Sequence, residues 1–177
     1  MENIRELKKF WSKKRVLITG HTGFKGSWLS IILTYLNSTI DGYSLKPKKN
    51  SLFNKSTIFK KLKSNTYSDI NNLTKLKKKI KDCKPEIIFH LAAQPLVIDS
   101  YKDPIKTLNT NIMGTANLLE SIRNIKSIKS VVIITTDKVY KIKKNNKAYR
   151  ELDQLSGFDP YSASKVGTEI VVESYIK

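Results

Sequence analysis

Three glycines at three-residue spacing lie between an apolar run and an amphipathic one in VLITGHTGFKGSWLSIIL, residues 16–33. This pattern predicts a strand that ends at Gly20, a tight turn, and a helix over 24–37. Backbone N–H groups at a helix start are unpaired and partly positive, so they can bind a pyrophosphate if no side chain blocks them. Gly20 would allow the turn, Gly23 the close approach of a ligand, and Gly26 tight helix packing. Ordinary turns also contain such triplets, but the strand–turn–helix context favours phosphate binding.

The rest of the chain continues this alternation of strands and helices. Alternation implies right-handed crossovers and a parallel sheet. The predicted fold is α/β, a Rossmann-type doubly wound parallel sheet with strand order 3-2-1-4-5 and a ligand crevice between strands 1 and 4. We expect a single dinucleotide-binding domain over residues 1–177. The expected strands cover 15–20, 38–45, 65–70, 86–93 and 130–136, and the expected helices cover 24–37, 72–83, 104–125 and 160–177.

The composition favours a protein without nucleic-acid or membrane partners. The 177 residues carry a formal net charge of +18, but the lysines are scattered and lack interleaved aromatic residues, so a solvated surface is favoured over a nucleic-acid site. None of the apolar runs approaches the ~20 residues that span a bilayer. The single cysteine, Cys83, excludes an internal disulfide and suits a reducing compartment. We expect a cytoplasmic protein with no metal site.

The end of the second predicted strand bears on the choice of dinucleotide. An acidic residue there would bind the ribose 2′-hydroxyl and favour NAD. The sequence instead has Ser44, followed by Lys46, which could tolerate a 2′-phosphate; Asp41 lies too early in the strand. The choice between NAD and NADP therefore stays open. Asp69, which closes the third strand, could accept a hydrogen bond from adenine or could equally cap the helix over 72–83.

A tyrosine and a lysine lie four residues apart in the last predicted helix, at Tyr161 and Lys165. They share one face of that helix, and a phenol beside an ammonium is easier to ionise. Such a phenol can act as a base toward a sugar hydroxyl. Thr136 closes the fifth strand, at the rim where parallel α/β sheets bind ligands. Most Tyr-x-x-x-Lys pairs reflect chance or helix packing, so this interpretation depends on the glycine turn and the sheet before it.

These motifs together resemble the extended short-chain dehydrogenase/reductase family, which includes NAD-dependent epimerases and dehydratases. The resemblance is strongest to the branch of nucleotide-sugar 4,6-dehydratases that act on CDP-glucose, and it spans nearly the whole chain. The segments that carry it are HTGFKGSWL, GYSLKP, HLAAQPLV, TNIMGTANLLE, TTDKVY and DPYSASK.

The resemblance implies roles for the matching residues. Thr136, Tyr161 and Lys165 would form the hydride-transfer group, with Lys165 also bonding the nicotinamide ribose. The residues implied to bind NAD are Gly20, Thr22, Gly23, Phe24 and Gly26 near the pyrophosphate, Asp69 and Ile70 near the adenine, Leu91, Ala92, Ala93 and Gln94 near the nicotinamide ribose, and Tyr161 and Lys165 themselves.

The reaction implied is an internal oxidation and reduction that yields a 4-keto-6-deoxy sugar nucleotide for surface polysaccharide. Tyr161 would take the proton of the sugar 4-hydroxyl while C4 gives a hydride to NAD; water then leaves from C5 and C6, and the hydride returns to C6. Asp137 would be the acid toward the C6 hydroxyl. The C5 base stays open, because Lys138 would need a lowered pKa to act as a neutral amine. The alternative is that Asp137 and Lys138 form an ordinary surface pair.

Other residues receive structural interpretations. Asn111 is implied to support the sheet from the long helix. We interpret His21 as a spacer that exposes backbone, His90 as a packing residue, and the Phe and Trp residues of 24–35 as core.

Two other functions stay open: a different nucleotide-sugar epimerase or dehydratase, and a non-catalytic dinucleotide-binding module. Members of the family are about twice this length and commonly form homo-oligomers. We therefore expect this chain to lack the later strands and the smaller substrate domain. It should keep most of the dinucleotide site but bind sugar nucleotide weakly.

Overall fold

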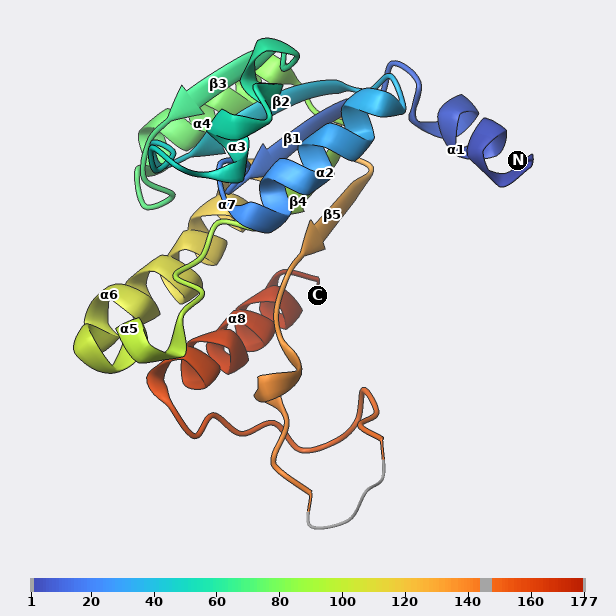
Figure 1. Ribbon diagram of the computed structural model, residues 1–177. Helices are drawn as coiled ribbons and strands as arrows, with labels where there is room; N and C mark the ends of the chain where they lie inside the picture. The colour runs from blue at the N-terminus through green and yellow to red at the C-terminus, as the bar shows by residue number, and fades with distance from the viewer. Residues whose placement is uncertain (1, 144–147, 177) are drawn as a thin grey trace. The chain divides into compact units, whose positions relative to one another are not determined.

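The computed structural model describes residues 2–143 and 148–176 (Figure 1). The chain divides into two compact units. The first runs up to Ala92 and includes Glu120–Ile134, and the second comprises Ala93–Leu119 and the chain from Thr135 on. In the described part of the chain, no helix is long and apolar enough to cross a membrane. The same residues contain no group of three or more His, Cys, Asp or Glu side chains that could hold a metal ion.

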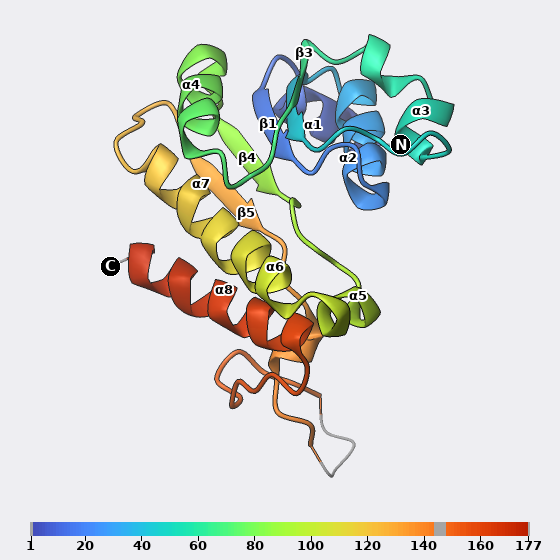
Figure 2. The ribbon, with the colours of Figure 1, turned by 90° about the vertical axis from the view of Figure 1, so that its left-hand side faces the viewer.

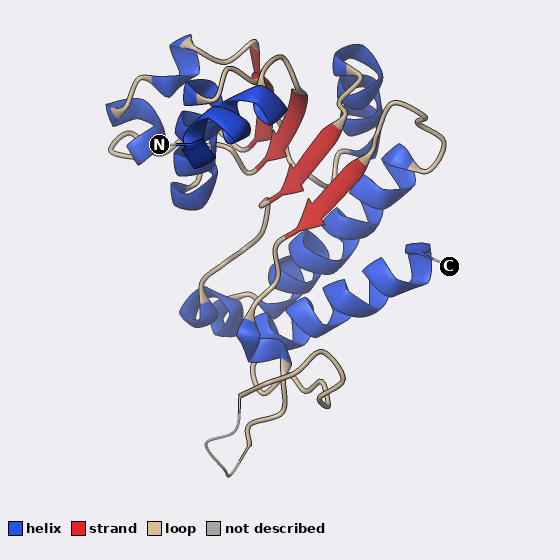
Figure 3. Cartoon of the chain, turned by 90° about the vertical axis from the view of Figure 1, so that its right-hand side faces the viewer, coloured by secondary structure: helices blue, strands red, loops and turns tan. Residues whose placement is uncertain are grey.

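The first unit contains a five-stranded parallel sheet in the order β3-β2-β1-β4-β5, as predicted. Its strands, red in Figure 3, are four to six residues long. The bounds are β1 Arg15–Thr19, β2 Thr39–Ser44, β3 Ser64–Tyr67, β4 Ile87–His90 and β5 Ser130–Ile133.

Helices of the first unit lie on both faces of this sheet. Figure 2 shows α2 on one side of β1 and α4 on the other. The helical spacing of apolar residues predicted α2 and α4, but it did not predict α1. The helices of this unit are α1 Glu2–Trp11, α2 Phe24–Tyr35, α3 Leu52–Lys55, a short 3-10 helix at Ile58–Lys60, and α4 Leu73–Cys83.

The hydrophobic core of this unit follows the two-residue period of the strands. Val16 and Ile18 of β1 join a buried cluster that includes Leu33 of α2. Leu17 is also buried and points to the opposite face, where α4 packs with Leu76 and other buried residues. Both faces of β1 are therefore covered, as expected for a central strand of a parallel sheet.

The buried face of α2 differs from the prediction. The helix buries Gly26, Ser27, Ser30 and Leu33, and the large side chain of Trp28 is exposed. Ser27 and Ser30 satisfy their hydroxyls by donating to backbone carbonyls one turn earlier, at 2.7 and 2.8 Å. Small side chains let the helix approach the sheet closely, so the aromatic side of α2 is not core.

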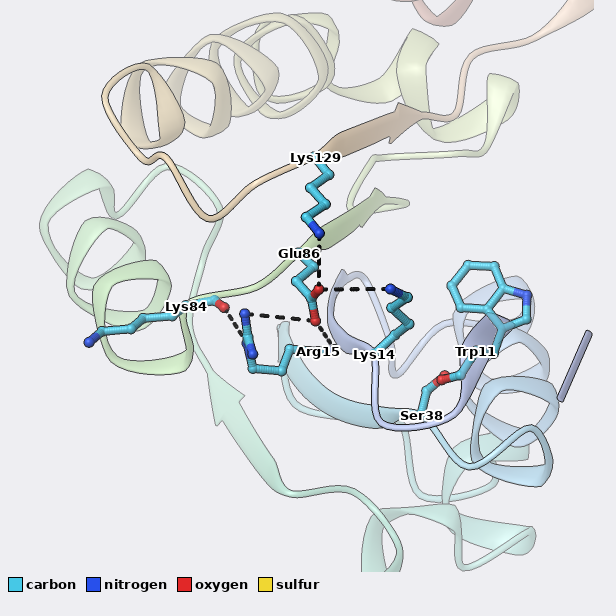
Figure 4. A network of polar contacts seen from close by, with 7 residues as sticks. All are labelled: Trp11, Lys14, Arg15, Ser38, Lys84, Glu86 and Lys129. Carbon is cyan, nitrogen blue, oxygen red and sulfur yellow. Dashed lines mark hydrogen bonds and ion pairs between the residues drawn. The ribbon is translucent and has the colours of Figure 1, made fainter. Parts of the chain in front are cut away.

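A carboxylate joins the amino ends of three strands of the first unit (Figure 4). Oxygens of Glu86 lie 3.7–3.9 Å from the side-chain nitrogens of Lys14, Arg15 and Lys129. The backbone N–H of Arg15 also donates to Glu86, and its guanidinium donates to the carbonyl of Lys84 at 2.8 Å. The backbone hydrogen bond from Arg15, helped by these cations, lowers the pKa of Glu86. This network fixes the ends of β1, β4 and β5 beside one another.

The second unit is helical, and α8 lies alongside α6 within it (Figure 2). The single helix expected over 104–125 is instead divided by a π-helical segment at Asn109–Met113 and ends at Ile122. A short helix, α5, precedes it and was not predicted. The elements are α5 Val97–Lys102, α6 Pro104–Leu108, α7 Gly114–Ile122, which begins in this unit, a 3-10 helix at Asp137–Val139, and α8 Pro160–Ile176.

Candidate functional site

The turn after β1 requires glycine at two positions. Gly20 has a φ of +75°, and a Cβ placed there would lie 2.6 Å from the backbone N of Ala92 and from the carbonyl carbon of Leu91. A Cβ on Gly26 would lie 2.2 Å from the carbonyl oxygen of Gly20. Both contacts are with backbone, so neither can be relieved by a side-chain movement. The predicted role of Gly20 in the turn is therefore confirmed, and Gly26 lets α2 pack closely on the backbone of that turn.

Gly23 stands at the open side of the same turn. It is the N-cap of α2, and no described side chain caps it. A Cβ there would meet only the carbonyl oxygen of Gly20, at 3.3 Å, among the described residues. The first turn of α2 carries no acidic residue. The amino end of α2 thus keeps its partial positive charge without an internal anion.

Two hydroxyl groups attach the turn to neighbouring strands. Thr22 Oγ1 lies 2.8 Å from the hydroxyl of Ser44, at the end of β2, and donates to the carbonyl of Leu45 at 3.0 Å. Thr19 Oγ1 lies 2.7 Å from Nδ1 of His90 and accepts a hydrogen bond from the N–H of Ala92 at 3.3 Å. The carboxyl ends of β1, β2 and β4 are therefore joined through side chains. His90 is a packing residue, as interpreted from the sequence.

His21 is not the spacer that the sequence suggested. Its ring is fully buried, and its Nε2 lies 3.2 Å from the amide oxygen of Asn65. The ring also packs edge-on against Phe53 and parallel to Tyr67. It occupies the space above Gly42, where a Cβ would come within 2.5 Å of the imidazole. Burial lowers the pKa of His21 to about 4, so the ring is neutral at physiological pH.

The acidic residues near the second and third strands have defined partners. Asp41 forms a buried ion pair with Lys79 at 2.6 Å and also accepts a hydrogen bond from Ser64. Asp69 accepts the backbone N–H of Asn71 at 2.8 Å. The cap of α4 is Asn72, whose side chain accepts the N–H of Lys75, so the interpretation of Asp69 as that cap is wrong.

In the second unit, α8 begins at Pro160 and carries Tyr161 and Lys165 one turn apart. Asp159 accepts the backbone N–H and the hydroxyl of Ser162, at 2.9 and 2.7 Å. Burial alone would raise the pKa of Asp159, but these hydrogen bonds and one from the backbone of Tyr161 outweigh burial and lower it. Lys165 is buried and Tyr161 is partly buried.

Asn111 holds three parts of the second unit together from within the π-helical segment. Its side-chain oxygen accepts the N–H of Gln94 at 2.8 Å, and its amide nitrogen donates to the carbonyl of Gln94 at 3.1 Å. The same nitrogen donates to the hydroxyl of Ser164 at 2.7 Å, and Thr168 donates to the Asn111 carbonyl. These contacts are with the segment after β4 and with α8, whereas the expected support was to the sheet.

The segment after β5 is attached to α8 by a residue that the sequence did not single out. Thr135 donates to the carboxylate of Glu169 at 2.5 Å. The next residue, Thr136, donates to Asp137 at 3.2 Å and accepts the N–H of Lys138 at 3.4 Å. Glu169 lies one helical turn after Lys165, so it ties this segment to the helix that carries Tyr161 and Lys165. The signal in the sequence that could have identified Glu169 is its position four residues after Lys165.

The structure thus assigns the predicted site residues to two groups. The first unit contains Gly20, Thr22, Gly23, Phe24, Gly26, Asp69, Ile70, Leu91 and Ala92, and the second contains Ala93, Gln94, Thr136, Asp137, Lys138, Tyr161 and Lys165.

Comparison with known proteins decides the family. The family model described as GDP-mannose 4,6 dehydratase matches residues 17–177. The chain belongs to this family. Among its relatives, CDP-glucose 4,6-dehydratase of Salmonella typhimurium is 47% identical over 95% of this chain and 47% of that protein. The dTDP-D-glucose 4,6-dehydratase of Dictyostelium discoideum is 36% identical over 93% of this chain and 41% of that protein.

The chain is also similar to a solved structure of a nucleotide-sugar enzyme. The UDP-glucuronic acid 4-epimerase of Bacillus cereus, in complex with UDP-glucuronic acid and NAD, matches with a TM-score of 0.76 and 28% identity over 90% of this chain and 51% of that one. The chain therefore spans about half the length of the family members that it matches.

Proposed function

We propose that this chain is the dinucleotide-binding part of a nucleotide-sugar 4,6-dehydratase that acts on CDP-glucose with NAD. The observation that carries the proposal is the glycine turn, which leaves the amino end of α2 open at Gly23 while its other two glycines are fixed by close backbone contacts. The 47% identity to a CDP-glucose 4,6-dehydratase supports this substrate over other nucleotide sugars. The NAD complex of the Bacillus cereus relative supports the cofactor.

The residues of the first unit fit a dinucleotide pyrophosphate. A phosphate at the amino end of α2 would supply the anion that neither a capping side chain nor an acidic first turn provides. Thr22 would hold the turn through its contact with Ser44. Leu91 and Ala92, which lie against Gly20, would line the neighbouring part of the site.

The end of β2 leaves the choice of dinucleotide to experiment. Asp41 is committed to its ion pair with Lys79, so it is unavailable to a ribose 2′-hydroxyl. Lys46 is exposed just after the strand and could accept a 2′-phosphate. Both NAD and NADP should therefore be titrated.

The proposed chemistry assigns one task to each residue of the second unit. A bound NAD would supply the acceptor and later the donor of a hydride. The Lys165 ammonium would stabilise Tyr161 as a phenolate, and this phenolate would take the proton of the sugar 4-hydroxyl and become a neutral phenol. Thr136 would orient that hydroxyl. Asp137 would protonate the leaving C6 hydroxyl, and Lys138 is the candidate base for the C5 proton.

Thermal unfolding of the purified chain with NAD or NADP tests the cofactor. A ligand at 100 times its dissociation constant should add about 2.7 kcal/mol to the free energy of unfolding. The control is Gly23→Ala: its backbone conformation is ordinary for alanine, and among the described residues its Cβ would meet only the carbonyl oxygen of Gly20, at 3.3 Å. A small shift relieves this contact, so the variant should fold while losing most of the ligand stabilisation. A folded wild-type chain that neither dinucleotide stabilises at millimolar concentration would refute the proposal.

Sugar-nucleotide turnover separates the dinucleotide proposal from the whole reaction. We expect the 177-residue chain alone to bind dinucleotide without converting CDP-glucose, since it spans about half of its relatives. In a protein of the relatives' full length, Tyr161→Phe should abolish conversion and leave NAD-dependent stabilisation intact. Conversion retained by this variant would refute the role of Tyr161, whereas a full-length wild type that binds dinucleotide without converting any nucleotide sugar would favour the binding-module hypothesis. A cytoplasmic location and a homo-oligomeric full-length protein stay predictions.

A further inference from the structure

The amino-terminal helix α1 carries an apolar side that its own unit leaves about half exposed. Ile4, Leu7 and Phe10 follow one another at a spacing of three residues, so they lie on one side of the helix. They are 49%, 44% and 56% exposed. Large apolar residues that gather in one patch of a surface mark an interaction site.

Contacts near its carboxyl end attach α1 to the rest of the first unit. Trp11 packs against the core cluster, and the centre of its ring lies 6.1 Å from that of Phe89. The backbone carbonyl of Trp11 accepts the hydroxyl of Ser38 at 2.9 Å. Figure 1 shows α1 beyond the end of α2, at the outside of this unit. The apolar side near Ile4 and Leu7 can therefore reach a surface outside the unit.

Basic residues accompany this apolar side. Residues 2–15 contain six Lys or Arg residues and two Glu residues. One of the lysines, Lys14, places its Nζ 5.5 Å from the centre of the Phe10 ring, at the rim of the apolar patch. A helix with large apolar side chains on one side and Lys or Arg on the other, without a long apolar run, is typical of segments that lie on anionic bilayers.

We propose that α1 binds the surface of a membrane that contains anionic lipids. Ile4, Leu7 and Phe10 would enter the boundary between headgroups and acyl chains, and the Lys and Arg side chains of residues 5–15 would meet the headgroup phosphates. The expectation of no membrane partner rested on the lack of a bilayer-spanning apolar run and on the scatter of the lysines. A helix that lies at the bilayer surface needs no such run, and the sequence did not predict α1.

Other occupants fit this surface less well. Nucleic acid would pair with the basic residues but would leave the apolar side of α1 in water. A second copy of this chain would cover the apolar side, but each copy carries a net charge of +18 and the two would repel. An anionic bilayer satisfies both features at once. This inference goes beyond the dinucleotide site and does not depend on it.

Flotation with vesicles tests the proposal directly. The purified 177-residue chain is mixed, without dinucleotide, with vesicles of phosphatidylcholine alone or with vesicles in which roughly one third of the lipid is phosphatidylglycerol. We expect the chain to float with the anionic vesicles only. Leu7→Ser with Phe10→Ser should weaken this binding at least about tenfold while the net charge is unchanged. The matched control, Leu152→Ser with Phe158→Ser, removes the same two kinds of side chain from exposed positions of the second unit and should bind as the wild type does.

A second pair of variants separates binding by α1 from adsorption through lysines elsewhere. Lys8→Gln with Lys9→Gln should weaken binding more than Lys60→Gln with Lys61→Gln, which removes an equal charge from another surface of the same unit. The α1 lysine variant keeps every apolar residue, so it decides the question if circular dichroism shows that the apolar variant does not fold.

Four results would overturn the proposal. The folded chain could fail to float with the anionic vesicles, or the folded apolar variant could bind them as tightly as the wild type. The two lysine variants could weaken binding equally, which would indicate adsorption through charge alone. A DNA duplex could bind in place of the vesicles and be lost from the Lys8 and Lys9 variant, which would identify nucleic acid as the occupant.

Discussion

Protonation of one buried histidine should make the stability of this chain fall steeply in mild acid. His21 is neutral in the folded protein because burial lowers its pKa to about 4. Nearby Lys79 increases this effect, and the hydrogen bond that Nε2 donates to the amide oxygen of Asn65 partly opposes it. In the unfolded chain the pKa returns to the ordinary value of 6.5. The unfolded state therefore binds the proton more readily, and stability rises with pH across this window. Titration of His21 therefore leaves the free energy of unfolding unchanged above about pH 6.5 and lowers it progressively as the pH falls toward 4.

The magnitude follows from the two pKa values. The full difference corresponds to about 3 kcal/mol at 1.36 kcal/mol per pKa unit. Between pH 7 and pH 5, the part that is lost is about 2 kcal/mol. This loss is large beside the total stability of roughly 5–15 kcal/mol that is typical of a domain.

Urea unfolding of the wild type and of His21→Gln at pH 7, 6 and 5 measures this loss. The glutamine amide can still donate to Asn65, but it does not titrate, so the variant should be less stable at pH 7 and lose less stability on acidification. Subtracting the two curves removes the contribution of carboxylates and of His90, the other histidine in the chain. If both proteins lose stability equally between pH 7 and 5, the assignment of a neutral buried His21 is refuted. Titration of the two imidazole signals by NMR gives the pKa directly.

Three substitutions probe the packing around the site and the sheet. Gly26→Ala forces a Cβ against the carbonyl of Gly20 and should lower the free energy of unfolding by about 2–3 kcal/mol. The variant should also lose its stabilisation by dinucleotide, and a melting temperature equal to that of the wild type would contradict the packing argument. Asp41→Asn leaves the buried ammonium of Lys79 without its carboxylate and should lower the free energy of unfolding by about 3 kcal/mol, measured by urea unfolding. Replacing both residues by leucine should recover most of this loss. No recovery would mean that the ion pair itself is required. Glu86→Gln should cost about 1 kcal/mol at neutral pH, less in 1 M salt and less as acid protonates Glu86 in the wild type; a salt-independent loss would argue against the ion-pair network.

Much of the candidate site could be predicted because its signals are local. The turn has two positions, Gly20 and Gly26, that only glycine can occupy, because a Cβ at either would clash with backbone atoms. The spacing of the glycines in the sequence shows this requirement directly. Tyr161 and Lys165 lie on one helix, where spacing alone sets a shared face. Thr19 and Glu169 were missed because their partners, Ala92 and Thr135, are distant in sequence and no spacing rule connects them.

The sequence alone determined the strand order and the position of the glycine turn, because alternation of strands and helices restricts the topology and short motifs carry their own geometry. The division of the predicted site residues between two compact units came from the structure. The tertiary structure decided which side of each element is buried. Periodicity identifies Trp28 and Tyr35 as one face of α2, but it cannot say that Ser27 and Ser30 face the sheet, since that choice depends on how closely the backbone of α2 can approach β1. For the same reason His21 became a core residue: the space above Gly42 exists only once β1 and β2 are paired.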